Sequence, residues 1–213
     1  MVTKRQGTGR PVRADRAVLV VVVLMLTVVG ACGRDASPAV HRVTVVGDSL
    51  SVLGDAQIRA ELEAAGWDAR VDAFAGRTVA AQMGALALAA RDSSQAIVIQ
   101  LGTNDAHALA KHDTDPQTER DQISQALDLF RPGQCLVWVN ADADPLRPGA
   151  AGGKVVDDLV AEAAQTRSNL HVADLFALLR AHPEYLLADE VHLTEAGSIA
   201  LGGLMADALA SCG

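Results

Sequence analysis

The chain has 213 residues, a length that fits one domain with an appendage and argues against a large multidomain protein. Half of the residues are hydrophobic and 21% are charged, which is typical of a globular rather than a disordered chain. The formal net charge is −8, and residues 1–31 carry five basic residues against one acidic residue, so the remainder carries −12. A body this acidic argues against nucleic-acid binding.

The N-terminus has the features of an export signal. Residues 1–16 are polar and basic, Ala17–Val29 are continuously apolar, and the small residues Gly30 and Ala31 precede Cys32. A basic segment, an apolar stretch and small residues at its end are typical of a secretory signal peptide. As a helix, this apolar stretch rises only about 20 Å, which is shorter than the roughly 30 Å of a bilayer's hydrocarbon core.

The segment Val29-Gly30-Ala31-Cys32 resembles the lipobox of bacterial lipoproteins, in which the cysteine is lipidated and becomes the new N-terminus. We therefore expect a signal peptide over residues 1–31, a short tether over 32–41 and one domain over 42–213. The mature protein is expected outside the cytoplasm, held at the cell membrane by a lipid on Cys32. Ordinary signal cleavage, with secretion and an incidental Cys32, is the alternative.

In chain order after the tether, buried-strand patterns alternate with segments whose apolar residues recur at helical spacing. The predicted strands are His41–Gly47, Asp68–Ala73, Ala96–Leu101, Cys135–Asn140 and Leu170–Ala173. The predicted helices are Leu50–Ala65, Thr78–Ala90, Thr118–Phe130, Gly153–Thr166 and Thr194–Ala210, the last with Thr194 as its N-cap. This alternation predicts a five-stranded parallel sheet with helices on both faces.

Ligands of such sheets bind beyond the carboxyl ends of the strands, so the residues that follow the strands are the candidates for function. Polar and glycine-containing segments stand after the first, second and third strands and before the last helix. They are Gly47-Asp48-Ser49-Leu50, Ala75-Gly76-Arg77, Gly102-Thr103-Asn104-Asp105 and Asp189-Glu190-Val191-His192. All four are expected at one rim of the sheet.

These segments together supply the parts of a hydroxyl nucleophile. Ser49 needs a base to remove its proton. His192 can be this base, because an imidazole titrates near neutral pH. Asp189 can fix the tautomer of that ring and stabilise its charged form. The backbone N–H groups of Ser49 and Gly76 and the side-chain amide of Asn104 can donate to the oxygen that becomes negative during acyl transfer.

Each segment alone has a simpler interpretation. Ser49 can cap the first helix, Asn104 can form a turn, and Asp189 and His192 can be a surface pair. The presence of all four segments, each at the rim that the fold predicts, favours the catalytic interpretation.

With these four segments the sequence resembles the SGNH (GDSL) hydrolase family of esterases, lipases and carbohydrate acyl esterases, from Val43 to about Leu209. The resemblance implies a flavodoxin-like three-layer α/β/α fold, Ser49 as the nucleophile, and no metal or other cofactor. The pair Gly76-Arg77 looks like that of SGNH-type O-acetyltransferases that act on cell-wall sugars, although a surface arginine explains Arg77 equally well.

Three functions follow. The first is a serine esterase that hydrolyses short-chain acyl or carbohydrate O-acyl esters through an acyl-Ser49 intermediate. The second is a transferase that passes the same acyl group to a cell-wall sugar hydroxyl. The third is a non-catalytic lipoprotein that binds carbohydrate or lipid.

Other polar residues are expected to be structural. A polar group after Asn104 is expected in a solvated loop that can still border the substrate pocket, and two aspartates after the fourth strand are expected in turns. These are His107, His112, Asp113 and Asp115, and then Asp142 and Asp144. His171 and His182 are also expected to be structural.

Cys135 and Cys212 are candidates for a disulfide. Cys135 begins the fourth strand, and the last helix runs antiparallel to the strands, so its end reaches the edge of the sheet opposite the active site. An oxidising compartment favours a bridge, and free buried thiols are the alternative.

Overall fold

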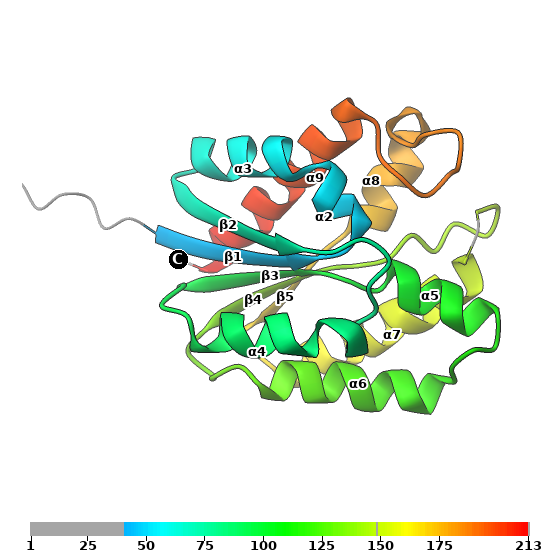
Figure 1. The fold of residues 1–213 in the computed structure, drawn as a ribbon, viewed down its shortest axis with the longest axis horizontal. Coiled ribbons are helices and arrows are strands. Elements are labelled where there is room, and N and C mark those ends of the chain that lie inside the picture. The colour runs from blue at the N-terminus through cyan, green and yellow to red at the C-terminus, as the bar shows by residue number, and fades with distance from the viewer. Residues whose placement is uncertain (1–40, 148, 213) are drawn as a thin grey trace, which may run out of the picture. The chain divides into compact units, whose positions relative to one another are not determined.

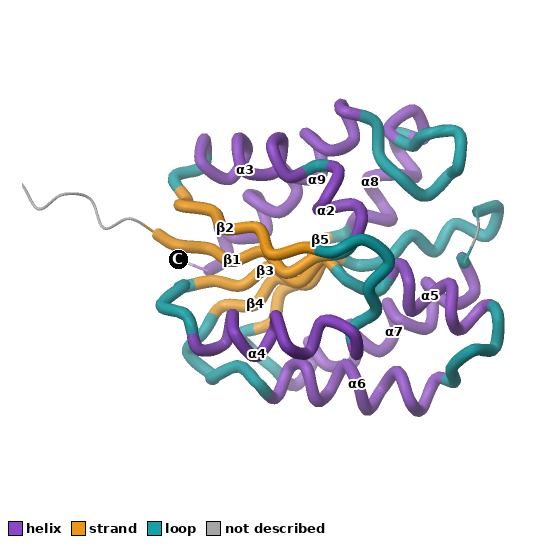
Figure 2. The backbone as a smooth tube through the Cα atoms, viewed as in Figure 1, coloured by secondary structure: helices purple, strands orange, loops and turns teal. Residues whose placement is uncertain are grey.

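The computed structural model of the protein describes residues 41–147 and 149–212, so the predicted signal peptide, nearly all of the tether and Cys32 lie outside the described residues. Five strands form one parallel sheet in the order β2-β1-β3-β4-β5 (Figures 1 and 2). They are β1 (His41–Gly47), β2 (Trp67–Ala73), β3 (Ala96–Gln100), β4 (Cys135–Val139) and β5 (Leu170–Ala173). This is the flavodoxin-like strand order, and the predicted fold class is confirmed.

Helices cover both faces of the sheet, as Figure 1 shows. One face packs against α2 (Ser49–Leu53), α3 (Asp55–Ala64), α8 (Leu175–Ala181) and α9 (Glu195–Leu209). The other packs against α4 (Met83–Arg91), α5 (Thr103–Ala110), α6 (Pro116–Asp128) and α7 (Ala150–Thr166). Each face has its own buried apolar cluster, which is why the central strands are apolar on both sides.

The strand order reverses between β1 and β3, which lie side by side in the middle of the sheet. Their carboxyl ends are in register, with Gly47 opposite Gln100. At such a reversal the two connections leave toward opposite faces and open a crevice beyond the strand ends. The segments Asp48-Ser49 and Gly102-Asn104 therefore start next to each other.

The helix expected over 50–65 is wrong as a single element, because it breaks at Gly54. The Gly54 N–H donates to the Leu50 carbonyl and ends α2, and α3 begins at Asp55. A Cβ at Gly54 would lie 3.1 Å from that carbonyl oxygen and from the Ser198 side chain on α9. Close packing of α9 against this bend therefore favours a glycine there.

Two short helices were absent from the prediction. The helix α5 includes His107, so the loop expected after Asn104 is wrong for that residue, and Asp115 caps α6 by accepting from the N–H groups of Gln117 and Thr118. The helix α8 is also short. Helices of seven or eight residues give little periodicity to detect, and they form here through tertiary packing. The predicted N-cap Thr194 is confirmed, since its Oγ1 accepts from the Gly197 N–H.

In the structure, Cys135 and Cys212 are joined by a disulfide, with their Cα atoms 5.5 Å apart and 77 positions between them in the sequence. Cys135 is the first residue of β4, and Cys212 lies in a 3₁₀ turn (Ala210–Cys212) after α9. The bridge therefore lies at the amino ends of the strands.

No helix within 41–147 or 149–212 combines the length and the apolar character needed to cross a membrane.

Candidate active site

Ser49 is the first residue of α2, directly after β1. The residue that caps this helix is Asp48, whose Oδ1 accepts from the Leu50 N–H at 3.0 Å. The capping interpretation of Ser49 is therefore wrong, because its neighbour satisfies the helix terminus. The Ser49 hydroxyl is left to project at the carboxyl end of the sheet.

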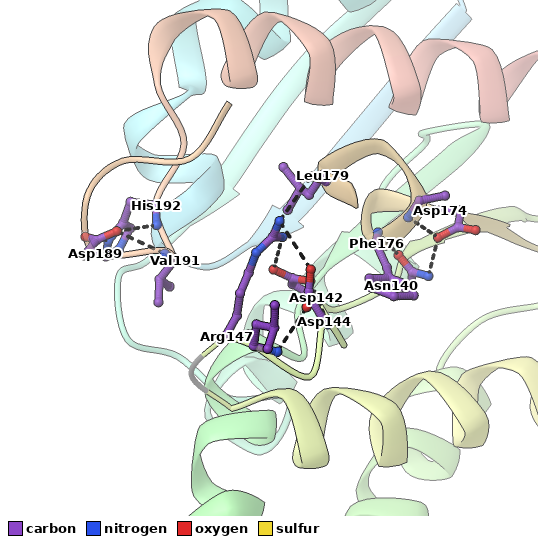
Figure 3. Close-up of polar contacts among 12 residues, drawn as sticks. Asn140, Asp142, Asp144, Arg147, Asp174, Phe176, Leu179, Asp189, Val191 and His192 are labelled. Atoms are coloured by element: carbon purple, nitrogen blue, oxygen red, sulfur yellow. Dashed lines mark hydrogen bonds and ion pairs between the residues drawn. The ribbon is translucent and has the colours of Figure 1, made fainter. Parts of the chain in front are cut away.

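A hydrogen-bonded chain joins the serine to the segment before α9. The Ser49 Oγ lies 3.0 Å from Nε2 of His192, and Nδ1 of His192 lies 2.8 Å from Oδ2 of Asp189. Figure 3 shows the Asp189 carboxylate directed at the imidazole of His192. The fold brings together residues that are 143 positions apart in the sequence. In this arrangement the imidazole can take the serine proton while the carboxylate stabilises the resulting charge.

Asp189 also shapes the loop that carries the histidine. Its Oδ1 accepts from the backbone N–H groups of Val191 and His192, at 3.0 and 2.9 Å. Between them Glu190 adopts a left-handed conformation with φ of 59°, which is uncommon for a residue other than glycine. The hydrogen bonds from the His192 ring and from the two backbone groups lower the pKa of Asp189 to about 2. The carboxylate is therefore ionised at neutral pH.

Gly76 lies in the exposed loop after β2 and has φ of +71°. A Cβ there would meet nothing within 4 Å in the structure, so the left-handed backbone, rather than crowding, favours glycine at this position.

The side-chain amide of Asn104 makes two hydrogen bonds within the protein. Its Nδ2 donates to Oδ2 of Asp48 at 3.2 Å and to the carbonyl of Arg77 at 3.1 Å. An amide nitrogen has two hydrogens, so a substrate oxygen must share or replace one of these acceptors. The Arg77 carbonyl belongs to the loop of Gly76, and this contact joins the two predicted oxyanion donors.

Burial raises the pKa of Asp48, which has no exposed surface and lies between the Leu50 N–H and the Asn104 amide. Its position beneath the candidate oxyanion site makes it a residue that orients Asn104. In the sequence, Asp48 stands out only as part of the Gly47-Asp48-Ser49-Leu50 motif.

Gln100 is a second supporting residue that the sequence analysis missed. Its Oε1 accepts from the hydroxyl of Ser51 at 2.7 Å and from the Ser51 N–H at 3.2 Å. It thereby fixes the first turn of α2 to the end of β3. A signal existed, since Gln100 is a polar residue at the end of an otherwise apolar strand.

Asp105 ties the Gly76 loop to α5. Both of its carboxyl oxygens accept from the Val79 N–H, at 3.0 and 3.2 Å, and it lies beside the buried Glu119 of α6. Burial, together with the Glu119 carboxylate, raises the pKa of Asp105 to about 7. Two buried carboxyl groups thus stand behind the candidate site.

Among residues 41–147 and 149–212, no three His, Cys, Asp or Glu side chains are grouped closely enough to hold a metal ion. A cavity of about 790 Å³ lies at the amino end of the sheet, beside Trp67 and the disulfide, and no residue of the Ser49–His192–Asp189 chain lines it. The candidate catalytic residues therefore lie at the opposite, carboxyl end of the sheet.

The sequence matches a known protein family. Residues 45–198 match the model of the GDSL-like Lipase/Acylhydrolase family. The chain belongs to this family. The match runs from β1 into α9 and so includes Ser49, Gly76, Asn104, Asp189 and His192.

An individual relative matches about half of the chain. The O-acetyltransferase OatA of Staphylococcus aureus is 34% identical over 112 residues, which are 52% of this chain and 16% of that protein. The chain thus spans a small part of this relative's length.

Solved structures share the fold. The C-terminal catalytic domain of the peptidoglycan O-acetyltransferase OatA of Streptococcus pneumoniae superposes with a TM-score of 0.66 at 19% identity, covering 81% of this chain and 94% of that domain. TesA superposes with a TM-score of 0.65 at 20% identity, covering 81% of this chain and 99% of that chain. At these identities the structures establish the fold.

Proposed function

We propose that the protein is a serine esterase in which Ser49 is the nucleophile, His192 the general base and Asp189 the residue that orients and charges the imidazole. The observation that carries this proposal is the 3.0 Å contact between the Ser49 Oγ and the His192 Nε2, with Asp189 at 2.8 Å from the other ring nitrogen. The membership of the chain in a family of lipases and acylhydrolases supports it.

In the first half of the reaction, the Ser49 Oγ attacks the carbonyl carbon of the ester while its proton passes to Nε2 of His192. The carbonyl oxygen becomes negative and is stabilised by the N–H groups of Ser49 and Gly76 and by Asn104. The alcohol then leaves with the proton from His192, and the acyl group stays on Ser49.

In the second half, a water molecule attacks the acyl-Ser49 carbonyl while His192 takes one of its protons. The tetrahedral intermediate collapses, the carboxylic acid leaves, and the proton returns to the Ser49 oxygen. No group besides the residues of the chain and water is needed to balance these steps.

Transfer to a sugar hydroxyl is the second candidate function, and it uses the same acyl-Ser49 intermediate with a sugar in place of water. The relatives that support it are the S. aureus O-acetyltransferase and the S. pneumoniae peptidoglycan O-acetyltransferase domain. On this basis we propose a short-chain acyl ester or O-acylated carbohydrate as the substrate class.

We also propose that the protein is exported through the signal in residues 1–31 and anchored by a lipid on Cys32. The basic and apolar segments and the lipobox-like sequence support export, and so does the peptidoglycan-modifying relative. Mass spectrometry of the membrane fraction should find a diacylglyceryl group on Cys32. A soluble, unmodified N-terminus would contradict the anchor and leave the esterase untouched.

The test of the esterase is turnover of p-nitrophenyl acetate by the described domain. Ser49→Ala should lower kcat by at least about 10⁴-fold with unchanged folding, because the nucleophile is removed. Ser168→Ala, at an exposed serine before β5, is the matched control and should keep full activity. Unchanged turnover in Ser49→Ala would overturn the mechanism, whereas no turnover by the wild type would leave the non-catalytic binding protein.

Adding a chitooligosaccharide acceptor separates hydrolysis from transfer. An esterase releases acetate at the same rate with or without the acceptor. A transferase forms the acetylated sugar and releases p-nitrophenol quickly only when the acceptor is present.

A further inference from the structure

A small cavity of about 20 Å³ is lined in part by residues that flank the candidate nucleophile and base. Two of its lining residues are chain neighbours of that pair, since Leu50 follows Ser49 and Val191 precedes His192. The opposite wall is apolar and comes from α8, through Leu175 and Leu179, both of which are 2% exposed. Ser49 and His192 do not line the cavity themselves, and its other lining residues include the polar Thr103, His107 and Glu190.

Arg147 clamps two parts of the cavity wall together. Its Nη1 donates to Oδ2 of Asp142 at 2.6 Å, and its Nη2 donates to the carbonyl of Leu179 at 3.2 Å. Asp142 and Leu179 both line the cavity, the first from the segment after β4 and the second from α8. Figure 3 shows the guanidinium reaching between these two segments.

The clamp is a partly buried ion pair rather than a fully exposed one. The Arg147 side chain is 9% exposed, and a second carboxylate, that of Asp144, stands 3.6 Å from it. The planar guanidinium can serve several acceptors at once, which a lysine ammonium cannot do with the same geometry. The turns that Asp142 and Asp144 form, by accepting from the N–H groups of Asp144 and Leu146, present both carboxylates to Arg147.

We propose that Arg147 sets the length of the acyl group that the site accepts, by holding the segment after β4 against α8 so that the cavity admits only an acetyl group. The proposal rests on the proposed function of Ser49. It makes Arg147 a positioning residue, since it acts through the cavity wall and does not touch the reacting atoms.

The size of the cavity supports an acetyl limit. A volume of about 20 Å³ is little more than one water-sized sphere, which matches one methyl group. In this proposal a propionyl or butyryl chain has to push the cavity wall outward, and Arg147 bonds two residues of that wall, Leu179 and Asp142. One excess methylene in such a pocket changes kcat/KM by about 10-fold or more.

The experiment compares p-nitrophenyl acetate, propionate and butyrate as substrates of Arg147→Met. The wild type should lose about 10-fold in kcat/KM for each added methylene. Arg147→Met keeps an aliphatic chain of similar length but no longer bonds Asp142 and the Leu179 carbonyl. The ratio of its kcat/KM for butyrate to that for acetate should therefore rise at least about 10-fold. Arg120→Met is the matched control, because Arg120 pairs with Glu162 on the surface of α6 and α7, and it should keep the wild-type ratio.

A second variant leaves the ion pair intact and so decides the outcome if Arg147→Met fails to fold. Leu179→Val removes one methylene from the cavity wall and should raise the propionate-to-acetate ratio about 10-fold. A folded Arg147→Met that keeps the wild-type ratios would overturn the role of Arg147. Unchanged ratios in Leu179→Val would overturn the cavity as the acyl site.

Failure of the proposed function gives a different pattern. If Ser49→Ala turns over all three esters as the wild type does, the nucleophile is wrong whatever the chain-length profile. If Ser49→Ala is inactive and the wild type accepts all three esters equally, the esterase stands and the acetyl limit is wrong.

Discussion

The two ends of the sheet are built in different ways. At the amino ends of the strands, a covalent bond between Cys135 and Cys212 fixes β4 to the C-terminal turn. At the carboxyl ends, the loops are held by side-chain hydrogen bonds from buried or half-buried polar groups, such as Asp48, Asp105 and Arg147. The disulfide at the amino end stabilises the fold, whereas the hydrogen bonds at the carboxyl end position side chains that can react.

The difference has an energetic meaning. Buried carboxyl groups with raised pKa values, and left-handed backbone at Glu190, destabilise the fold where they occur. These groups lie next to, or within, the hydrogen-bonded triad of Ser49, His192 and Asp189. Substitutions at the carboxyl end should therefore change activity first, and substitutions at the amino end should change stability first.

The largest effect is expected for Asp189→Asn. The amide cannot stabilise a charged imidazole and favours the wrong ring tautomer, so kcat should fall by about 10³–10⁴-fold. Ester hydrolysis checks this, with Asp92→Asn as the matched control, because Asp92 accepts from the Ser93 N–H at the amino end. Equal activities in the two variants would remove Asp189 from the mechanism.

The next effect is on stability. Replacing both Cys135 and Cys212 by serine releases a loop of 77 positions and should lower the free energy of unfolding by up to about 4 kcal/mol. Urea denaturation measures it, and kcat should remain within about twofold of wild type because the bridge is remote from the serine. Two free thiols in non-reducing mass spectrometry of the wild type would contradict the bridge.

A smaller loss is expected for Asn104→Ala, which removes one donor to the developing negative oxygen. We expect kcat to fall by about 10²–10³-fold with little change in KM. The matched control is Asn169→Ala, since Asn169 donates to the Gln134 carbonyl at the amino end of β5 and should affect only stability. A fall in activity no larger than that of the control would show that the amide serves Asp48 and Arg77 alone.

The smallest effect is a pH dependence of stability. The pKa of Asp105 is raised from 3.8 to about 7 in the folded protein, so the folded state binds its proton more tightly than the unfolded state does. The stabilisation from this proton is complete below pH 3.8 and is lost as the pH rises toward 7.

Asp105→Asn should therefore raise the unfolding free energy by about 1–2 kcal/mol at pH 8, because an amide cannot ionise. It can also donate to Oε2 of Glu119, a buried atom without a hydrogen-bond partner among residues 41–147 and 149–212. Little gain is expected at pH 4. Thermal melts at both pH values check this, with the exposed Asp113→Asn as control. An equal change at both pH values would reject titration of Asp105 as the cause.

Much of the fold could be predicted from the sequence. The strands over 41–47 and 170–173 have the predicted bounds, and the other three differ by one residue at one end. Runs of β-branched residues, bounded by glycines or by helical patterns, are local signals of a strand. Tertiary packing does not alter the strands that they predict. The short helices α5 and α8 and the break at Gly54 were missed because packing against distant segments produces them.

The candidate site divides in the same way. Ser49, Asp189 and His192 could be named from four short segments, because parallel strands bring their carboxyl ends to one rim. The sequence by itself determined which reactive groups meet. Only the tertiary structure decided their surroundings: the two acceptors of Asn104, the Asp105–Glu119 pair and the cavity whose walls Arg147 joins. Each of these depends on atoms of segments far apart in the chain, and no local pattern of residues records such distances.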